Sequence, residues 1–349
     1  MAGFLADEII IPFADDTSAV CIAVDRSSNP NRSYYYQKIV DTHSLNETPL
    51  GPLAILQNIT RAEVEQFYPN YHEYHLQIPP VLTDRIPNFA SGSPSTSIIA
   101  LMFFVLYPYH LMRLIDTTRH TIIADHLLSH AHTVRFNSAS TLCFFTLSTG
   151  CSCFRVDNGL IPLFHKDLAS SFTIPHQATW CAHRWGIFQR TKSVWYLTLL
   201  DEQTGAIVDR IRLHGRPDTI SAARSAPIVA CGLNKNRIQI IDIDTSRSIV
   251  VRHNASTEPY NRMDVAVASD GLRIAARGTY DQTLWCVSCG HDTFIELMPL
   301  PNVETGVNAS DFLIYMPGFC LLNDRYLTIS RGDIASSTIN LPGIAAGKW

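Results

Sequence analysis

The sequence predicts an all-β fold in which short four-stranded antiparallel sheets repeat along the chain, and three observations support this prediction. Apolar runs of strand length alternate with turns rich in Asp, Asn, Gly and Ser. The later turns recur at nearly constant intervals. The 349-residue chain is 46% hydrophobic and only 17% charged, a composition that favours sheets covered on both faces over amphipathic helices exposed to water.

One segment, residues 263–297, shows the repeating unit most clearly. Its apolar runs VAVA, LRIAA and TLWCVS are separated by turn residues at 269–271 and 279–282. A fourth run, FIEL, follows a turn at 289–292. Four strands in about forty residues is the size of one blade of a β-propeller, so we expect the blade to be the unit that the chain repeats.

Turns of this kind recur along the chain. They fall at Asp25, Tyr68-Pro69-Asn70, Asp116, Asp157, Asp201, Asp244, Cys289 and Arg331. From Asp116 to Cys289 the intervals are 41, 44, 43 and 45 residues, a regularity typical of repeat architectures. Because too few residues precede Asp25 for a complete blade, we expect a single closed β-propeller of seven blades, with eight blades as the alternative. In this interpretation the N-terminal strands complete the last sheet, which removes exposed sheet edges.

We expect one domain spanning 1–349, because no linker, charge run or low-complexity block divides the chain. Residues 45–97 depart from the repeat pattern and are predicted to hold an insertion or a degenerate blade. Within them, Thr60 resembles the N-cap of a short helix, and 89–97 (FASGSPSTS) is predicted to be a flexible loop.

The most apolar run, Ile98–Leu106, is well short of the ~20 apolar residues that a membrane helix needs. We expect two buried strands that meet at Tyr107-Pro108. The opening residues MAGFLADEIIIPFADD lack the charged and apolar regions of a signal peptide. We therefore expect an intracellular, cytoplasmic protein whose nine cysteines are reduced thiols.

The segment SDGLRIAARGTYDQTLWCVS resembles a WD repeat, with Asp281 in the turn before the third strand and Trp285 on that strand. In GLNKNRIQIIDIDTSRSI, the pair Ile241-Asp242 stands in the place of the family's Trp-Asp pair. The resemblance spans residues 97–342 and implies a WD-like propeller whose blades follow the family pattern to different degrees.

The sequence departs from the family pattern in one important respect. Its only Gly-His pair, Gly290-His291, lies in the turn after a third strand instead of at the opening of a repeat. We therefore expect the Asp-His-Ser-Trp hydrogen-bond network typical of the family to be absent from most blades. Those blades would depend on apolar packing between sheets.

Four histidines lie close together in HTIIADHLLSHAH, at positions 120, 126, 130 and 132. On a helix, His126 and His130 would share a face and could ligate zinc, and on a strand His130 and His132 would do so. We favour a strand running into a loop without a metal, because Asp125, the one acid inside the cluster, has no evident orienting role.

Two cysteine pairs are the other candidates for a metal or redox site. Cys286 and Cys289 form a CxxC with His291 nearby, and Cys151 and Cys153 form a CxC. The pairs sit three blades apart in the series, so a shared ion would require contact across the propeller axis. We favour buried structural cysteines.

The densest basic segment, DRIRLHGRP, carries Arg210, Arg212, His214 and Arg216. Arg210 and Arg212 are two residues apart and are expected on one strand face, where they could bind a phosphate or an acidic peptide. The alternative is a charged, solvated edge strand. The paired-arginine motif Phe-Arg-Arg-Gly of phosphoinositide-binding propellers is absent.

Aromatic residues gather in TWCAHRWGIFQRTKSVWYL, where Trp185 and Trp195 are candidate anchors for a partner protein. The alternative is that these rings pack between adjacent sheets, which we favour as the usual fate of aromatic residues in a blade.

The motifs GxSxG, GxxxxGK[ST] and GxGxxG are absent, and a net charge of −4 gives no general reason to bind nucleic acid. We expect a non-enzymatic scaffold for protein–protein interaction, without a cofactor, that serves as a subunit of a larger multiprotein assembly. Two alternatives stay open: a propeller that binds phosphoinositide or phosphate, and a propeller enzyme with a metal in its central channel.

Overall fold

The computed structural model describes the backbone of the chain in segments. These segments are 9–12, 18–25, 34–41, 47–52, 89–93, 96–106, 109–116, 119, 121–168, 172–252, 263–268, 270–278, 283–288, 295–299, 319–322, 325–330 and 333–338. Side-chain surroundings are described for 91–93, 96–102, 110–116, 119, 121–168, 178–252, 263, 265–268, 270–272 and 274–276. All the regular secondary structure in these segments is β-strand.

The described strands form seven antiparallel sheets, each built from strands consecutive in sequence. The first three sheets contain β1 (Ile9–Pro12), β2 (Ser18–Asp25), β3 (Tyr34–Asp41) and β4 (Glu47–Pro52); β5 (Phe89–Gly92), β6 (Ile98–Leu106), β7 (Tyr109–Asp116) and β8 (Thr121–Ser129); and β9 (Ala131–Phe136), β10 (Leu142–Leu147), β11 (Gly150–Val156) and β12 (Leu160–Asp167).

The next two sheets contain β13 (Phe172–Cys181), β14 (Arg184–Thr191), β15 (Val194–Asp201) and β16 (Ile207–Arg212); and β17 (Pro217–Ala222), β18 (Ile228–Leu233), β19 (Arg237–Asp242) and β20 (Arg247–Arg252). The last two contain β21 (Met263–Val267), β22 (Arg273–Gly278), β23 (Thr283–Ser288) and β24 (Ile295–Pro299); and β25 (Phe319–Leu322), β26 (Arg325–Ser330) and β27 (Asp333–Thr338).

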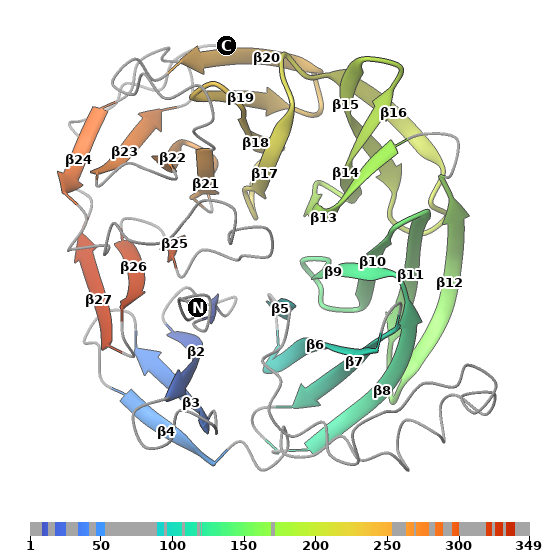
Figure 1. The fold of residues 1–349 in the computed structure, drawn as a ribbon, viewed down its shortest axis with the longest axis vertical. Helices are drawn as coiled ribbons and strands as arrows, with labels where there is room; N and C mark the ends of the chain where they lie inside the picture. The colour runs from blue at the N-terminus through green and yellow to red at the C-terminus, as the bar shows by residue number, and fades with distance from the viewer. Residues whose placement is uncertain are drawn as a thin grey trace.

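The sheets are arranged around a common centre, with the first strand of each sheet innermost and the last strand at the rim (Figure 1). The innermost strands contact one another in sequence order from β1 through β5, β9, β13, β17 and β21 to β25, and β25 also contacts β1. The chain therefore adopts the radial arrangement of sheets that the repeat pattern predicts.

The regular turns of the sequence are confirmed as connections between the third and fourth strands of a sheet. This holds at Asp116, Asp157, Asp201 and Asp244, and Cys289, which lies outside the described residues, falls in sequence between β23 and β24. At Asp201, Oδ1 accepts hydrogen bonds from the backbone N–H of Gln203 and from both the N–H and the hydroxyl of Thr204. The Thr204 hydroxyl bond is the main reason that the pKa of Asp201 lies below its usual value. Asp residues recur at these turns because a short carboxylate binds the backbone of its own turn.

Two predictions about the N-terminal part are wrong. Asp25 ends β2, so its turn joins the second and third strands of its sheet rather than the third and fourth. The first strand, β1, pairs with β2, with Ile9 opposite Ile22, instead of extending the last sheet. The eight-residue β2, whose residues 19–24 are all apolar, offers β1 a complete partner within its own hairpin, and a local pairing closes a shorter loop. The turn at 68–70 and the helix after Thr60 lie outside the described residues.

The segment around Ile98–Leu106 tests two further predictions. The two strands that meet at Tyr107-Pro108 are confirmed as β6 and β7. The prediction of a flexible loop at 89–97 is wrong in part, because residues 89–92 form β5 and pair with β6. Ser91 and Ser93 are buried there, and such small residues suit a short inner strand that neighbouring sheets approach closely.

The core lies between successive sheets and not within any one of them. Four buried clusters fill consecutive interfaces from the β5–β8 sheet to the β21–β24 sheet. The second strand of a sheet serves two of them at once. Cys143 and Phe145 on β10 face the preceding sheet, whereas Phe144 faces the following one. Because alternate side chains point to opposite faces, a strand buried on both faces reads as an uninterrupted apolar run.

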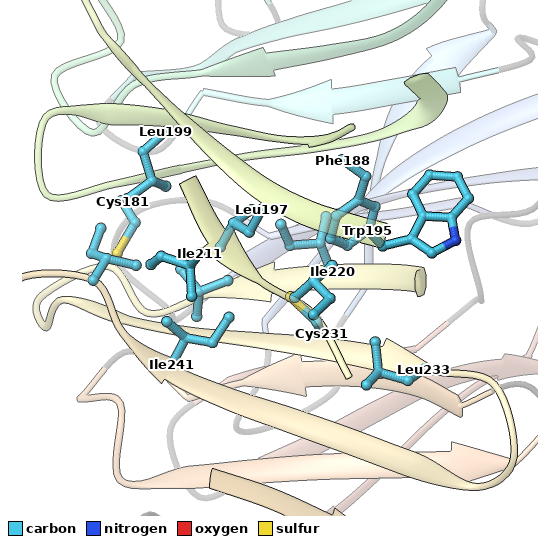
Figure 2. Close-up of a cluster of buried hydrophobic side chains, with 13 residues drawn as sticks. Cys181, Phe188, Trp195, Leu197, Leu199, Ile211, Ile220, Cys231, Leu233 and Ile241 are labelled. Carbon is cyan, nitrogen blue, oxygen red and sulfur yellow. The ribbon is translucent and has the colours of Figure 1, made fainter. Parts of the chain in front are cut away.

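Figure 2 shows the cluster between the β13–β16 and β17–β20 sheets, where Leu197, Ile211 and Cys231 meet. At the next interface a side chain and a backbone carbonyl of neighbouring sheets are in direct contact. Thr219 donates a hydrogen bond from its hydroxyl to the Met263 carbonyl at 2.6 Å, and a Cβ at Gly232 would collide with the same carbonyl oxygen. Glycine is therefore required in this strand by the close approach of a neighbouring backbone.

Replacing Trp185 by Ala is expected to destabilise the fold strongly. Its ring has no exposed surface and stacks on Phe144 of the preceding sheet with centroids 4.7 Å apart, so truncation leaves a cavity and costs about 3–5 kcal/mol. Urea unfolding followed by circular dichroism measures the loss. Val208→Ala is the control, since Val208 is exposed and its truncation should stay within about 0.5 kcal/mol. Equal losses for the two variants would contradict the packing described here.

Candidate functional site

The basic segment at the rim lies on β16, the last strand of its sheet. Ile211 is buried in the cluster shared with the next sheet, so Arg210 and Arg212 share the opposite strand face. Both arginines are exposed. This placement suits a partner-binding surface, and it also suits the alternative of an edge strand protected by charge.

His214 and Arg216 follow in the loop between β16 and β17, and both side chains are exposed. The loop backbone is held by Gln239, which is fully buried. Its Oε1 accepts a hydrogen bond from the His214 N–H at 2.9 Å, and its Nε2 donates to the Arg212 carbonyl at 3.0 Å. Neighbouring sheets are thus joined by one amide side chain that fixes where the loop presents its basic residues.

Asn234, at the end of β18, holds the same loop from the other side. Its Oδ1 accepts hydrogen bonds from the Arg216 N–H and from the Arg237 guanidinium, both at 3.2 Å. The Arg237 Nε also donates to the Asn234 carbonyl at 3.2 Å. The guanidinium lies over Gly215, where a Cβ would come within 2.6 Å of its Nη2. Arg237 is thereby fixed beside the loop that carries Arg216.

Two further cations reach this end of the β17–β20 sheet. Arg252, the last residue of β20, is directly opposite Arg237 in the strand register. Lys235 is exposed in the turn between β18 and β19, where it and Asn236 adopt φ of 62° and 56°, as the central residues of tight hairpin turns do. We call Arg216, Lys235, Arg237 and Arg252 the basic patch. Of these four residues, the sequence analysis singled out only Arg216. Arg237 and Arg252 lie at nearly equal distances on either side of the turn at Asp244, so pairing of the two strands as a hairpin could have placed them opposite each other.

The electrostatics of the basic patch follow from its geometry. Burial lowers the pKa of Arg237, and the neighbouring charge of Arg252 lowers it further. The ion pairs within the described part of the chain lie elsewhere, at Arg113–Asp125, Arg119–Asp116, His183–Glu202 and Arg184–Asp244. A chain with a net charge of −4 thus concentrates positive charge at one end of one sheet.

The two tryptophans predicted as partner anchors belong to the core. Trp185 is fully buried, and its indole N–H donates to the Glu202 carbonyl at 3.3 Å. Trp195 is 9% exposed, contributes to the cluster in Figure 2, and has the Arg190 guanidinium 5.7 Å from its ring centroid. Packing between sheets, which the sequence analysis favoured for these rings, is confirmed, and it leaves Trp185 no exposed surface for a partner to contact.

A polar cluster around Glu202 was missed by the sequence reasoning. Its carboxylate accepts a hydrogen bond from the Trp180 indole at 2.7 Å and lies 3.0 Å from the His183 Nδ1. On the same edge of the sheet, the Arg184 Nη1 donates to Asp244 at 2.9 Å and to the Ile243 carbonyl at 3.0 Å. The Glu202 contacts join elements of the β13–β16 sheet to one another, whereas the Arg184 contacts join that sheet to the β19–β20 turn of the next one.

The histidine-rich segment forms β8 and, after the single residue His130, β9. The predicted strand is confirmed, whereas the loop expected after it is wrong, because the chain continues directly into β9. His126 packs against Phe154 with ring centroids 4.9 Å apart, and burial lowers its pKa. The His132 Nε2 lies 2.7 Å from the Ser148 hydroxyl. His120 lies outside the described residues.

Within the described segments, no group of three or more His, Cys, Asp or Glu side chains is placed to hold a metal ion. Of the cysteine candidates, Cys151 and Cys153 are buried free thiols that face the β13–β16 sheet. Nothing is described of the side chains of Cys286 and Cys289, or of His291. The described residues also contain no helix of the length and apolar character needed to cross a membrane.

Comparison with known proteins identifies the fold. No protein-family model and no curated protein sequence matches the chain. Among solved structures, it resembles the β-propeller domain of Myceliophteria thermophila Cps50 (Swd1), with a TM-score of 0.62, 10% identity, and coverage of 97% of this chain and 99% of that one. It also resembles KlAtg21 in a complex with the coiled-coil of AgAtg16, with a TM-score of 0.59, 12% identity, and coverage of 96% and 100%.

A third similar structure is Kluyveromyces lactis Hsv2, with a TM-score of 0.57, 10% identity, and coverage of 95% of this chain and 90% of that one. These likenesses extend over almost the whole chain. The chain therefore has the fold of the WD-repeat-like β-propellers, as the resemblance in its sequence implies.

The buried thiols should resist alkylation while the protein is folded. Burial raises the pKa of Cys151, Cys153 and Cys181 to about 12 and that of Cys143 and Cys231 well above its usual value. Because the thiolate is the reactive form, these cysteines should remain unmodified by iodoacetamide at about pH 8. Mass spectrometry of peptides measures modification, and the urea-unfolded protein is the control in which all five react. Rapid modification of Cys151 or Cys153 in the folded protein would contradict their burial.

Proposed function

We propose that the protein is a non-enzymatic platform for protein–protein interaction and a subunit of a larger multiprotein assembly. The observation that carries this proposal is a basic surface fixed on a rigid ring of sheets. The loop that bears His214 and Arg216 is held by buried Gln239 and by Asn234, so its exposed side chains keep their positions without a partner. Such preorganisation lowers the entropic cost of docking.

The proposed platform is a single closed domain of seven blades spanning 1–349. Seven described sheets and the contact of β25 with β1 support this count. Residues 45–97 include β4 and β5, and we place the proposed insertion between those strands. Closure would leave no inner edge for unwanted strand pairing.

The residues proposed to contact partners are Arg210 and Arg212 on the rim and His214 and Arg216 in the adjoining loop. All four are exposed, and arginine is enriched where proteins bind each other tightly. Other subunits of a hetero-oligomeric complex are the proposed partners, in a reducing compartment such as the cytoplasm. The structure of KlAtg21 with the coiled-coil of AgAtg16 is an example in which a similar ring binds a protein partner.

A second candidate function is the binding of phosphate or phosphoinositide. The observation that favours it is the same positive charge at Arg216 and its neighbours, because guanidinium groups bind phosphate as well as carboxylate. The absence of a Phe-Arg-Arg-Gly motif weakens this candidate. For a propeller enzyme with a metal in its channel, no observation among the described residues offers support.

Affinity purification from native cells tests the platform proposal. The tagged protein should co-purify with stoichiometric partner proteins identified by mass spectrometry, and Arg210→Glu/Arg212→Glu should lose at least one of them, because reversing two rim charges repels the surface that they attract. The double substitution Arg155→Glu/Arg247→Glu is the matched control, since both residues are exposed and lie outside the proposed surface. Recovery of the wild-type chain alone, soluble and monodisperse, would refute the proposal.

A further inference from the structure

We propose that the basic patch of Arg216, Lys235, Arg237 and Arg252 binds an acidic, carboxylate-rich segment of a partner protein. This inference rests on the proposed function as an interaction platform and names the chemistry of one of its partners. It also assigns the contact to three residues that do not belong to the basic segment of the sequence.

The patch is assembled from three separate stretches of chain. Arg216 comes from the loop after β16, Lys235 from the turn between β18 and β19, and Arg237 and Arg252 from paired ends of β19 and β20. The stretches meet at one end of the β17–β20 sheet, where Asn234 accepts hydrogen bonds from the Arg216 N–H and from the Arg237 guanidinium. A ligand bound here would contact residues that are far apart in the sequence.

Its geometry is fixed before any ligand arrives. Arg237 makes two hydrogen bonds to Asn234, and the same side-chain oxygen holds the Arg216 backbone. Lys235 is presented at the tip of a turn whose backbone is set by two consecutive positive φ values. A charged surface built in this way pays little conformational entropy on binding an anion.

The repulsion between like charges in the basic patch indicates that the patch binds a negatively charged ligand. Two arginines occupy directly opposite positions on adjacent strands, where like charges destabilise a sheet. Burial lowers the pKa of Arg237, and repulsion from the charge of Arg252 lowers it further. Carboxylates placed between these cations would relieve this repulsion through charge-assisted, bidentate hydrogen bonds.

A protein segment fits the surroundings of the patch better than a membrane does. Stable attachment to a membrane usually needs an apolar anchor in addition to basic residues. Among the described residues, the exposed large hydrophobic side chains are Ile122, Ile161, Ile207, Val208 and Leu272. They lie on β8, on β12, at the start of β16 and in the turn before β22, whereas the patch adjoins the end of β16. The net charge of −4 also disfavours approach to an anionic surface.

Binding of a fluorescein-labelled polyglutamate peptide to the full chain tests this proposal. Fluorescence anisotropy should show saturable binding by the wild type that weakens as salt is raised. The variant Arg216→Glu/Arg252→Glu should bind about tenfold more weakly or worse. Arg155→Glu/Arg247→Glu changes the charge equally, and Arg247 lies at the opposite end of β20 from Arg252, so it should stay within about twofold of the wild type. Urea unfolding of each variant confirms that the fold is retained.

Three outcomes would overturn the proposal: absence of peptide binding by the wild type, equal weakening by the two variants, and patch-dependent binding of vesicles containing phosphatidylinositol phosphates without binding of the peptide. The third outcome would support the phosphoinositide candidate instead. The result is also independent of the purification experiment. If the protein binds the peptide through the basic patch but recovers no partner from cells, only the proposed assembly role is refuted. If it recovers partners from cells but does not bind the peptide, only the proposed role of the basic patch is refuted.

Discussion

Burial of both faces of each sheet is the constraint on which the rest of this structure depends. A single twisted sheet of four short strands covers neither of its faces, so each sheet must pack between two others. β10 shows the consequence within three residues, because Phe144 packs on the following sheet while its two neighbours pack on the preceding one. Radial repetition satisfies this demand for the three sheets from β9 to β20, both of whose faces are described as packed.

Some polar side chains link neighbouring sheets directly. Arg135 is half-buried and donates from Nε to the Ala178 carbonyl of the next sheet at 3.0 Å, and desolvation lowers its pKa to about 10. Gln239 performs the same linking role for the β16–β17 loop. Because these contacts join neighbouring sheets, they also fix the loops that carry the proposed partner-binding residues. The same side chains therefore stabilise the fold and set the geometry of the surface.

Much of the fold could be predicted because its signals are local. The third-to-fourth-strand turns could be placed from single Asp residues, since Asp201 and Asp242 bind the backbone of their own turns. The pairing of β1 with β2 could not, because its strand pattern would suit either its own hairpin or the last sheet. Packing of Trp185 between sheets was the favoured expectation, but its partner Phe144, about forty residues earlier, could not be predicted, because no local pattern reports that contact.

In the candidate site, too, some features could be predicted from local sequence patterns and others depend on contacts between distant residues. Arg210 and Arg212 could be assigned to one strand face from alternation alone, whereas Arg216 meets Arg237 through Asn234, a contact that no local pattern reports. A double-mutant cycle on Phe144 and Trp185, measured by urea unfolding, tests the dependence of the fold on packing between sheets most directly. The account predicts a coupling of about 0.5–1.5 kcal/mol between the two stacked rings. Strictly additive losses would show that the two sheets do not pack through these residues and would contradict the account.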